Sequence, residues 1–300
     1  MLERSPRGRV GGTRYCSSFR LAGRLWSAGP SFFASKTEML ISHRVRHFLP
    51  VGLVIFSACA GMSRVENPAP ALEADRPDFT EGIATVPPGW IQSEAGYTFS
   101  RADGNTSHSI GELLVRIPVS NHVEARLGFN SYSIEHAPGL VRRGFEDMEV
   151  GTKVRLIERE ERSLLPSLSV LALTTLPTGH RDIGTSVMQP TGILALGWQL
   201  SERLSLESNA KYTYASEDAT RFSQWATSAS LAAEITPRLG SFFEWFGTSP
   251  ASLGAKRADY LNTGVAMRLG NSLTLDARVG ANARRGSRDY FAGFGISRRW

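Results

Sequence analysis

Cysteine is almost absent from this 300-residue chain. Its two cysteines, Cys16 and Cys59, both lie within the first 60 residues. Residues 61–300 therefore have no thiol with which to form a disulfide or to ligate a metal ion. A body without thiols is typical of proteins that fold in an oxidising compartment, such as the bacterial envelope.

An excess of positive charge is also missing from most of the chain, although the whole sequence has a formal net charge of +6. Nine of the 34 Lys and Arg residues and two of the 28 Asp and Glu residues lie in residues 1–60, which leaves 25 basic and 26 acidic residues in the rest. We expect no nucleic-acid partner, because such a partner requires a basic surface on the folded domain.

Recognisable catalytic and cofactor-binding motifs are lacking. The sequence has no phosphate-binding glycine loop and no dinucleotide fingerprint. None of its six histidines stands at metal-ligand spacing. We therefore expect a protein that is not an enzyme and that has no catalytic residue, cofactor or metal site.

The apolar run near the N-terminus, Phe48–Phe56, is too short to span a bilayer as a helix. It follows Arg44 and Arg46 and precedes Ala58-Cys59-Ala60, which is the order of parts in a secretory signal peptide. We predict a signal peptide at residues 39–60, cleaved after Ala60.

Two alternatives stay open around this signal. Residues 1–38 are either an upstream extension from a mis-assigned start or a disordered basic tail. Phe56-Ser57-Ala58-Cys59 also resembles a lipobox, in which Cys59 would be acylated. Residues 61–89 are rich in Pro and Ala at their start, and we predict that they form a periplasmic linker and an N-terminal segment.

The last stretch of the chain, Arg288–Trp300, has the period-2 pattern of a strand with two different environments. A strand that ends on an aromatic residue is an exposed edge in a soluble sheet, whereas a closed membrane barrel has no edge. The pattern resembles the C-terminal assembly signal of outer-membrane barrels, with Phe294, Ile296 and Trp300 as the signal residues. Its larger, mostly apolar face consists of Trp300, Arg298, Ile296, Phe294, Ala292 and Tyr290, and its smaller face of Arg299, Ser297, Gly295, Gly293 and Phe291.

Amphipathic segments of this kind recur throughout residues 90–300, and charges stand at every second or fourth position of several of them. Such a density of charge does not suit a protein core, but it suits a wet lumen with lipid on the other side of the wall. Short connections alternate with longer ones, and the longer ones are predicted to include Arg101–Ser107, Ser133–Asp147 and Ala215–Arg221. We predict an all-β fold, a closed antiparallel transmembrane β-barrel of about 12 strands, with both termini periplasmic.

Two passages resemble a known family. They are Asp75–Glu81 continuing through Val86–Tyr97, and Leu275–Arg278 continuing through Gly293–Ser297. Both are similar to passages of the outer-membrane transporters named after the meta-cleavage pathway of phenol degradation. The resemblance covers residues 75–300 and implies a barrel that passes hydrophobic or aromatic compounds.

Alternation along the strands predicts the contents of the lumen. The charged inward set is Glu94, Glu112, Arg116, Glu124, Arg126, Lys153, Arg155, Lys211, Glu244, Arg268, Asp276 and Arg278, which we interpret mainly as a cross-strand ladder of ion pairs. Apolar residues are also predicted to face inward, and the candidate contacts for a solute are Leu171, Leu173, Phe242, Glu244 and Phe246. Leu165 lies on the same face of the predicted strand Leu164–Leu176 as the first two. These residues contact either a solute or the N-terminal segment, whose Asp75, Arg76, Asp78 and Glu81 either fold back as a plug or stay in solvent.

The predicted function is that of an outer-membrane transporter or channel of a Gram-negative bacterium, for the passive passage of small hydrophobic or aromatic compounds. Its partners would be the lipid bilayer, lipopolysaccharide, the outer-membrane assembly machinery and an apolar solute. The alternative is a non-conducting structural or adhesive barrel. A distant alternative is an outer-membrane hydrolase, with His180 and Asp182, or His108 with Ser107 and Ser109, at the outer rim.

Overall fold

The computed structural model describes residues 71–159, 163–185, 187–217, 220–250, 252 and 255–300. The predicted signal peptide, its cleavage site, Cys59 and the upstream extension lie outside these residues. Within the described ranges, no helix is long and apolar enough to cross a membrane.

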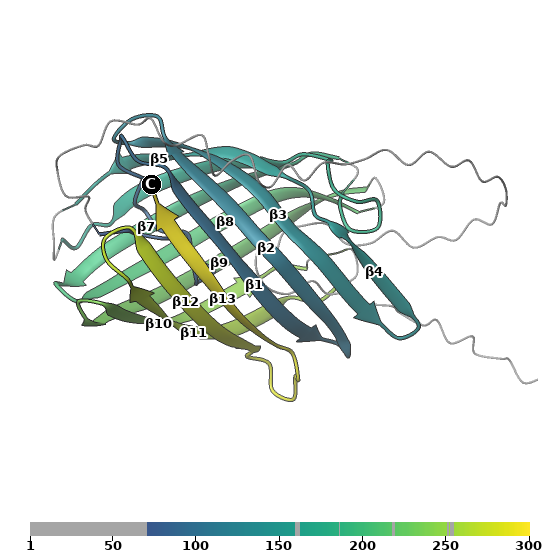
Figure 1. The fold of residues 1–300 in the computed structure, drawn as a ribbon. Helices are drawn as coiled ribbons and strands as arrows, with labels where there is room; N and C mark the ends of the chain where they lie inside the picture. Colours follow the sequence, from purple (N-terminus) through teal and green to yellow (C-terminus); the bar gives the residue numbers. More distant parts are fainter. Residues whose placement is uncertain (1–70, 160–162, 186, 218–219, 251, 253–254) are drawn as a thin grey trace, which may run out of the picture.

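The described residues form a closed antiparallel barrel (Figure 1). Except for β4 and β5, consecutive strands pair with each other, and β1 pairs with β13 to close the ring. β4 and β5 both pair with β3, one beyond the other, so that together they occupy one of twelve positions. This confirms the predicted fold class and strand number. The strands are β1 Gln92–Ala102, β2 Asn105–Pro118, β3 Val123–Ala137, β4 Leu140–Phe145, β5 Glu149–Ile157, β6 Ser167–Thr175, β7 Gln189–Ser201, β8 Leu204–Glu217, β9 Thr220–Thr236, β10 Leu239–Thr248, β11 Ala258–Arg268, β12 Leu273–Asn282 and β13 Tyr290–Arg299.

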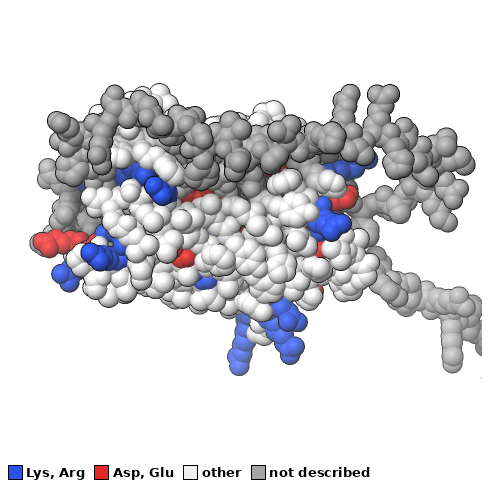
Figure 2. All heavy atoms as spheres, viewed as in Figure 1, with Lys and Arg blue, Asp and Glu red and all other residues white. Residues whose placement is uncertain are grey.

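Burial along the strands is inverted relative to a soluble protein. The largest fully buried side chains include Arg116, Arg126, Lys153 and Glu244, whereas Phe294 is 61% exposed. Charged residues inside a ring and apolar residues outside it are expected where lipid surrounds the wall and water enters the lumen. Figure 2 shows the outer face as mostly uncharged across its middle, with Lys and Arg atoms concentrated toward its ends and on projecting loops.

The barrel has two different ends. At the end where β1 begins and β13 ends, called the terminal end here, the connections include the two-residue turns at 202–203 and 237–238. The other end, called the loop end, has longer connections at residues 176–188, 249–257 and 283–289.

Three connections predicted as medium or long loops at the loop end are shorter than the sequence pattern indicated. Residues 101–107 contain a two-residue turn at Asp103-Gly104, both with positive φ (50° and 82°). In residues 133–147, β3 is extended to Ala137 and the chain returns as β4 after a turn at Pro138-Gly139. In the third connection, β8 continues to residue 217 and β9 begins at residue 220. An Asp-Gly pair favours this tight hairpin turn, and the flanking polar residues extend the strands beyond the length that a membrane requires.

The terminal strand has the two faces that its alternation predicts. Arg299 and Ser297 are buried inside the ring, whereas Phe294, Ile296 and Trp300 face outward. Trp300 also closes the sheet, because its backbone N–H donates to Ile91 and its carbonyl accepts from Ile91. The Arg298 guanidinium lies over the Trp300 ring at 4.0 Å, which explains how an arginine is tolerated on this apolar face.

Deletion of Trp300 is expected to reduce the folded, heat-modifiable fraction severalfold, because it removes both an exposed aromatic anchor and the last backbone pairing between β13 and the start of β1. Deletion of Ala255, in the loop before β11, is the control and should leave assembly unchanged. Gel mobility with and without heating measures both. Equal assembly of the two variants would contradict the role assigned to the terminal residue.

Candidate functional site

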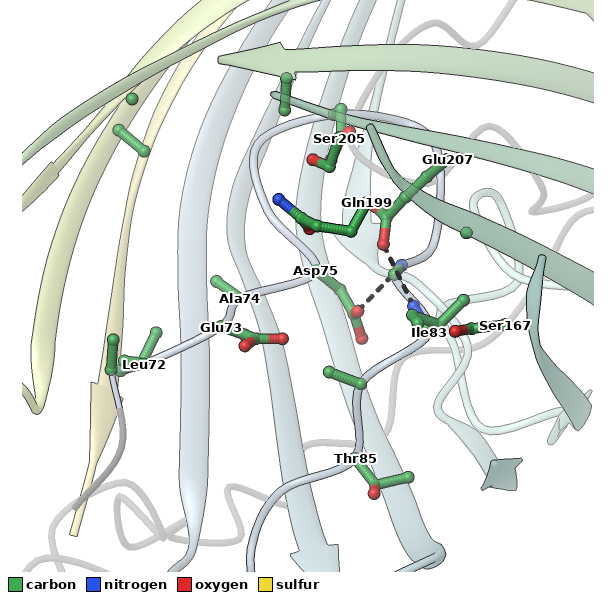
Figure 3. Close-up of a pocket in the computed structure, with 18 of the residues that line it drawn as sticks. Leu72, Glu73, Ala74, Asp75, Ile83, Thr85, Ser167, Gln199, Ser205 and Glu207 are labelled. Atoms are coloured by element: carbon green, nitrogen blue, oxygen red, sulfur yellow. Dashed lines mark hydrogen bonds between the residues drawn. The ribbon is translucent and has the colours of Figure 1, made fainter. Parts of the chain in front are cut away.

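The N-terminal segment folds back into the barrel. Residues 71–89, called the luminal segment from here on, enter from the terminal end, turn inside the lumen and return to β1. Figure 3 shows the turn, in which Asp75 and Ile83 lie on neighbouring limbs and Glu207 reaches toward Ile83 from the wall. The Gly82 N–H donates to the Asp75 carboxylate at 3.2 Å, which ties the two limbs together.

The luminal segment bridges opposite walls of the barrel. Asp75 pairs with Arg126 on β3, and the N–H groups of Phe79 and Thr80 donate to Glu244 on β10. β3 and β10 stand six positions apart in either direction around the twelve-position ring. The segment therefore crosses the full width of the lumen.

Side chains of the wall satisfy the backbone of the luminal segment. An extended chain without a neighbouring strand must find other partners for its N–H and C=O groups when it is buried. Carboxylates and an amide oxygen accept from its N–H groups, whereas guanidinium, ammonium, amide and hydroxyl groups donate to its carbonyls. The acceptors are Glu94, Glu244, Asn209, Glu207 and Glu124, and the donors are Gln92, Arg116, Arg278, Asn209, Lys153 and Ser169.

Asp75 is the centre of the largest ion-pair cluster. Its carboxylate lies 2.5 Å from Arg126, 2.9 Å from Lys153 and 3.3 Å from Arg116. Burial by itself would raise the pKa of Asp75, but these three cations outweigh it and hold that pKa well below its usual value. Glu81 adds a second acid of the segment, 2.8 Å from Arg126.

Arg76 occupies a slot lined by glycine. Its guanidinium lies between Glu112 at 2.5 Å and Asp276 at 3.4 Å, and it donates to the Phe294 carbonyl. Gly96 and Gly295 face each other across β1 and β13, and a Cβ at either residue would overlap this guanidinium. Two glycines on the inward face of the wall are thus required for the arginine to lie flat against it.

The predicted inward apolar residues form two clusters, and each contacts the luminal segment. Phe79 stacks on Phe246 with ring centroids 4.4 Å apart, in a cluster at the loop end that also contains Tyr260 and Phe291. Ile83 packs against the second cluster, which consists of Leu171, Leu173, Ile193 and Ala195. Of the two partners considered for these apolar groups, the segment is therefore in place, and contact with a solute stays a prediction.

The remaining candidates are placed as follows. Phe242 is buried and lines a cavity at the terminal end of the lumen. Leu165 is 62% exposed and precedes β6, so its predicted position within a strand from Leu164 to Leu176 is wrong. Pro166 separates it from the first paired residue, which is consistent with the poor fit of proline within a sheet.

Asp78 lies among like charges. Burial raises its pKa well above the usual value, and the carboxylates of Glu244 and Glu207 raise it further. A protonated Asp78 is therefore favoured when the segment is docked. Lys211, from the predicted inward set, lies 6.0 Å from the ring centroid of the neighbouring Phe79.

A cavity of about 800 Å³, called the vestibule here, lies at the terminal end of the lumen. The luminal segment forms one of its walls, as the labelled residues from Leu72 to Thr85 show in Figure 3. The rest of its lining is contributed by several strands, and includes Arg155, Ser205, Phe242, Arg268, Thr274 and Arg299.

The ladder interpretation of the inward charges is only part of the arrangement. Some pairs do join strands, such as Arg116 with Glu124 at 2.9 Å and Arg268 with Glu234 at 3.1 Å. However, the largest cluster contains Asp75, which belongs to the segment. Sequence reasoning did not identify Gly96, Gly295, Glu207 and Asn209 as contacts of the segment, although each stands in phase with the polar face of its strand.

Substitution of Gly96 by Ala is expected to release the luminal segment, because the added methyl group overlaps the Arg76 guanidinium and separates it from Glu112 and Asp276. Removal of one partner of a buried ion pair costs about 3–5 kcal/mol, which is an upper limit here because the guanidinium is the flexible end of its side chain. Limited proteolysis at Glu81 in the assembled barrel measures the release. Gly192→Ala in β7, where a Cβ meets open space, is the matched control. Equal protection of Glu81 in both variants would contradict the slot.

Docking of the segment is expected to weaken as pH rises, because the raised pKa of Asp78 means that the docked state binds its proton more tightly. The stabilising contribution is complete below the free carboxyl value of about 3.9 and is lost as pH rises through the docked value. The lowered pKa of Asp75 has the opposite effect on docking, because its stabilising contribution is lost as pH falls, and this loss occurs only at more acid pH. Protection of Glu81 from proteolysis between about pH 5 and 9 should fall in the unmodified chain and stay flatter in Asp78→Asn. Parallel profiles would contradict this assignment.

Comparison with solved structures finds similar barrels. An outer-membrane channel from Pseudomonas putida F1 is 12% identical, with a TM-score of 0.54, and the match covers 76% of this chain and 100% of that chain. The NanC porin is 11% identical, with a TM-score of 0.46 and coverage of 69% and 98%. The translocator domain of the autotransporter NalP from Neisseria meningitidis is 10% identical, with a TM-score of 0.39 and coverage of 70% and 87%. At 12% identity, the similarity to the Pseudomonas putida F1 channel shows the fold alone.

Comparison with curated protein sequences finds no match. A family model does match, over residues 74–300, and its range begins inside the luminal segment and ends at Trp300. The predicted resemblance is therefore confirmed over the segment and the barrel together. This chain belongs to the family described as "Putative MetA-pathway of phenol degradation".

Proposed function

We propose that this protein is an outer-membrane channel for the passive passage of small apolar or aromatic solutes, with a pore narrowed by the luminal segment. The observation that carries the proposal is the inverted burial in a closed ring that contains a vestibule of about 800 Å³. A wall of this kind is stable only with lipid outside it. The family name, which refers to phenol degradation, supports aromatic solutes.

In this proposal the termini and the terminal end face the periplasm, and the loop end faces outward, as in bacterial barrels with short periplasmic turns. The chain would be exported through the predicted signal peptide and inserted by the outer-membrane assembly machinery. Its outward neighbours would be lipid and lipopolysaccharide. Apolar surfaces inside the lumen, Phe242 in the vestibule and the cluster around Phe246, would contact the apolar part of a solute.

A non-conducting barrel is the second candidate, because the luminal segment crosses the lumen between opposite walls.

The histidine pairs considered for a hydrolase gain no support from the described residues. His108 Nδ1 is 2.8 Å from the Tyr97 hydroxyl, and Ser107 pairs with Ser100. His180 and Asp182 are 3.7 Å apart and both are exposed on a loop.

Conductance of the refolded barrel in planar bilayers tests the proposal. We expect small, steady conductance from the mature chain and a severalfold increase after deletion of residues 61–89, because the deletion removes the segment that crosses the lumen. Deletion of Ala255 is the control. Barrels that conduct in neither form, although correctly assembled, would establish the non-conducting alternative.

The solute class needs its own comparison in the same barrels. Uptake of phenol into proteoliposomes is expected to decrease in Phe242→Ser, whereas uptake of glycerol stays unchanged, because only the aromatic solute loses an apolar contact. An equal change for both solutes would contradict an apolar preference and leave the channel itself in place.

A further inference from the structure

One buried arginine in the lumen, Arg299, has no counter-ion among the residues that the structure describes. Arg299, on the inward face of β13, is 3% exposed, and its Nε and Nη1 atoms have no hydrogen-bond acceptor. Among the described residues its guanidinium forms no ion pair. Burial of a charge without a counter-charge is unfavourable, so that its presence points to a partner that binds there.

Two further unpaired polar groups lie beside it on the same hairpin. Ser297 is the preceding inward residue of β13, and Thr274 stands directly opposite Ser297 on β12. The hydroxyl oxygens of both are buried and have no hydrogen-bond partner. Arg299 and Thr274 line the vestibule, so these two donors face a space large enough for a small organic molecule, and Ser297 lies beside them.

Three other buried or half-buried arginines that line the vestibule, Arg155, Arg268 and Arg116, differ from Arg299. Arg155 pairs with Glu158 at 2.9 Å, and Arg268 pairs with Glu234 at 3.1 Å. Arg116 is bonded to Glu94 and Glu124 and to two carbonyls of the luminal segment. Each of these cations therefore has its charge matched within the protein.

The acid whose negative charge acts most strongly on Arg299 is Glu73, at the start of the luminal segment. The charge of Glu73 acts on Arg299, but no ion pair joins them in the described part of the chain. Gln92, which stands opposite Arg299 on β1, already uses its amide N–H groups on the Glu73 carbonyl and on Glu94. The immediate surroundings thus leave the guanidinium donors available.

We propose that Arg299, Thr274 and Ser297 form a binding site for the anionic group of a small organic acid in the vestibule. A guanidinium carries five N–H donors, and each hydroxyl adds one, which matches the acceptors of a carboxylate or a phosphate. Phe242 lines the same vestibule and offers an apolar surface for an attached ring. The inference rests on the proposed channel, and it adds aromatic carboxylates to the class of solutes.

Binding of benzoate to the refolded mature barrel tests the site, with calorimetry as the measurement and benzyl alcohol as the uncharged comparison. We expect benzoate to bind more tightly than benzyl alcohol. Arg299→Gln should weaken benzoate roughly ten- to hundred-fold, as expected for loss of a charged hydrogen bond, and leave benzyl alcohol unchanged. Glu73→Gln should strengthen benzoate, because it removes a nearby negative charge.

Arg298→Gln is the matched control, since Arg298 is the outward-facing neighbour of Arg299 on β13. If Arg299→Gln fails to assemble, the double variant Thr274→Val, Ser297→Ala carries the test, and it should weaken benzoate severalfold. Inorganic phosphate is the second probe. Competition between phosphate and benzoate supports a site for the anionic group itself. A lack of competition supports a site that requires both the carboxylate and the attached ring.

Equal binding of benzoate and benzyl alcohol, or unchanged benzoate binding in both Arg299→Gln and the double variant, would overturn the proposal. The result of this binding test is independent of the result of the conductance test. Conductance without benzoate binding would reject the anion site and keep the channel. Benzoate binding that depends on Arg299 in a barrel that does not conduct would support the site and reject passage.

Discussion

The ion pairs between Asp75 and the three cations Arg116, Arg126 and Lys153 determine how the rest of the lumen is arranged. All three cations are at most 2% exposed and stand on neighbouring positions of the wall. Glu94 and Glu124 supply part of the opposite charge from the wall itself. Asp75 supplies the third negative charge and Glu81 adds a fourth, so the three cations are fully matched only when the luminal segment is in place.

This dependence makes the segment and the barrel one electrostatic unit. Withdrawal of the segment would expose the three cations to water, which hydrates them, and would return the backbone donors and acceptors of the segment to solvent. The free energy of withdrawal is therefore the difference between the ion pairs and hydrogen bonds that are lost and the hydration that the freed charges gain. A segment held in this way can stay docked without a large apolar interface, and the stack of Phe79 on Phe246 adds about 0.5–1.5 kcal/mol.

The lumen has a different character on the two sides of the segment. Toward the loop end an aromatic cluster contains Phe246, Tyr260 and Phe291. Toward the terminal end the vestibule is lined mainly by polar and charged residues, with Phe242 among them. A solute with both an apolar ring and a polar group would find a matching surface on each side of the luminal segment. This match is the physical basis for the proposed passage of aromatic compounds, which the family name also suggests.

The sequence by itself determined the architecture and the orientation of most side chains. Period 2 is strict in a strand, and the faces of the terminal strand, with Arg299 inward and Phe294 outward, follow from counting back from Trp300. Loop lengths were predicted less well, because the Asp103-Gly104 turn and the extension of β3 into β4 depend on local turn chemistry. Tertiary structure decided which inward groups meet. Arg76 and Asp276 are 200 residues apart, and Gly96 and Gly295 come together only when β1 pairs with β13. Alternation fixes the face on which a residue lies, whereas closure of the ring and insertion of the segment fix its partner across the lumen.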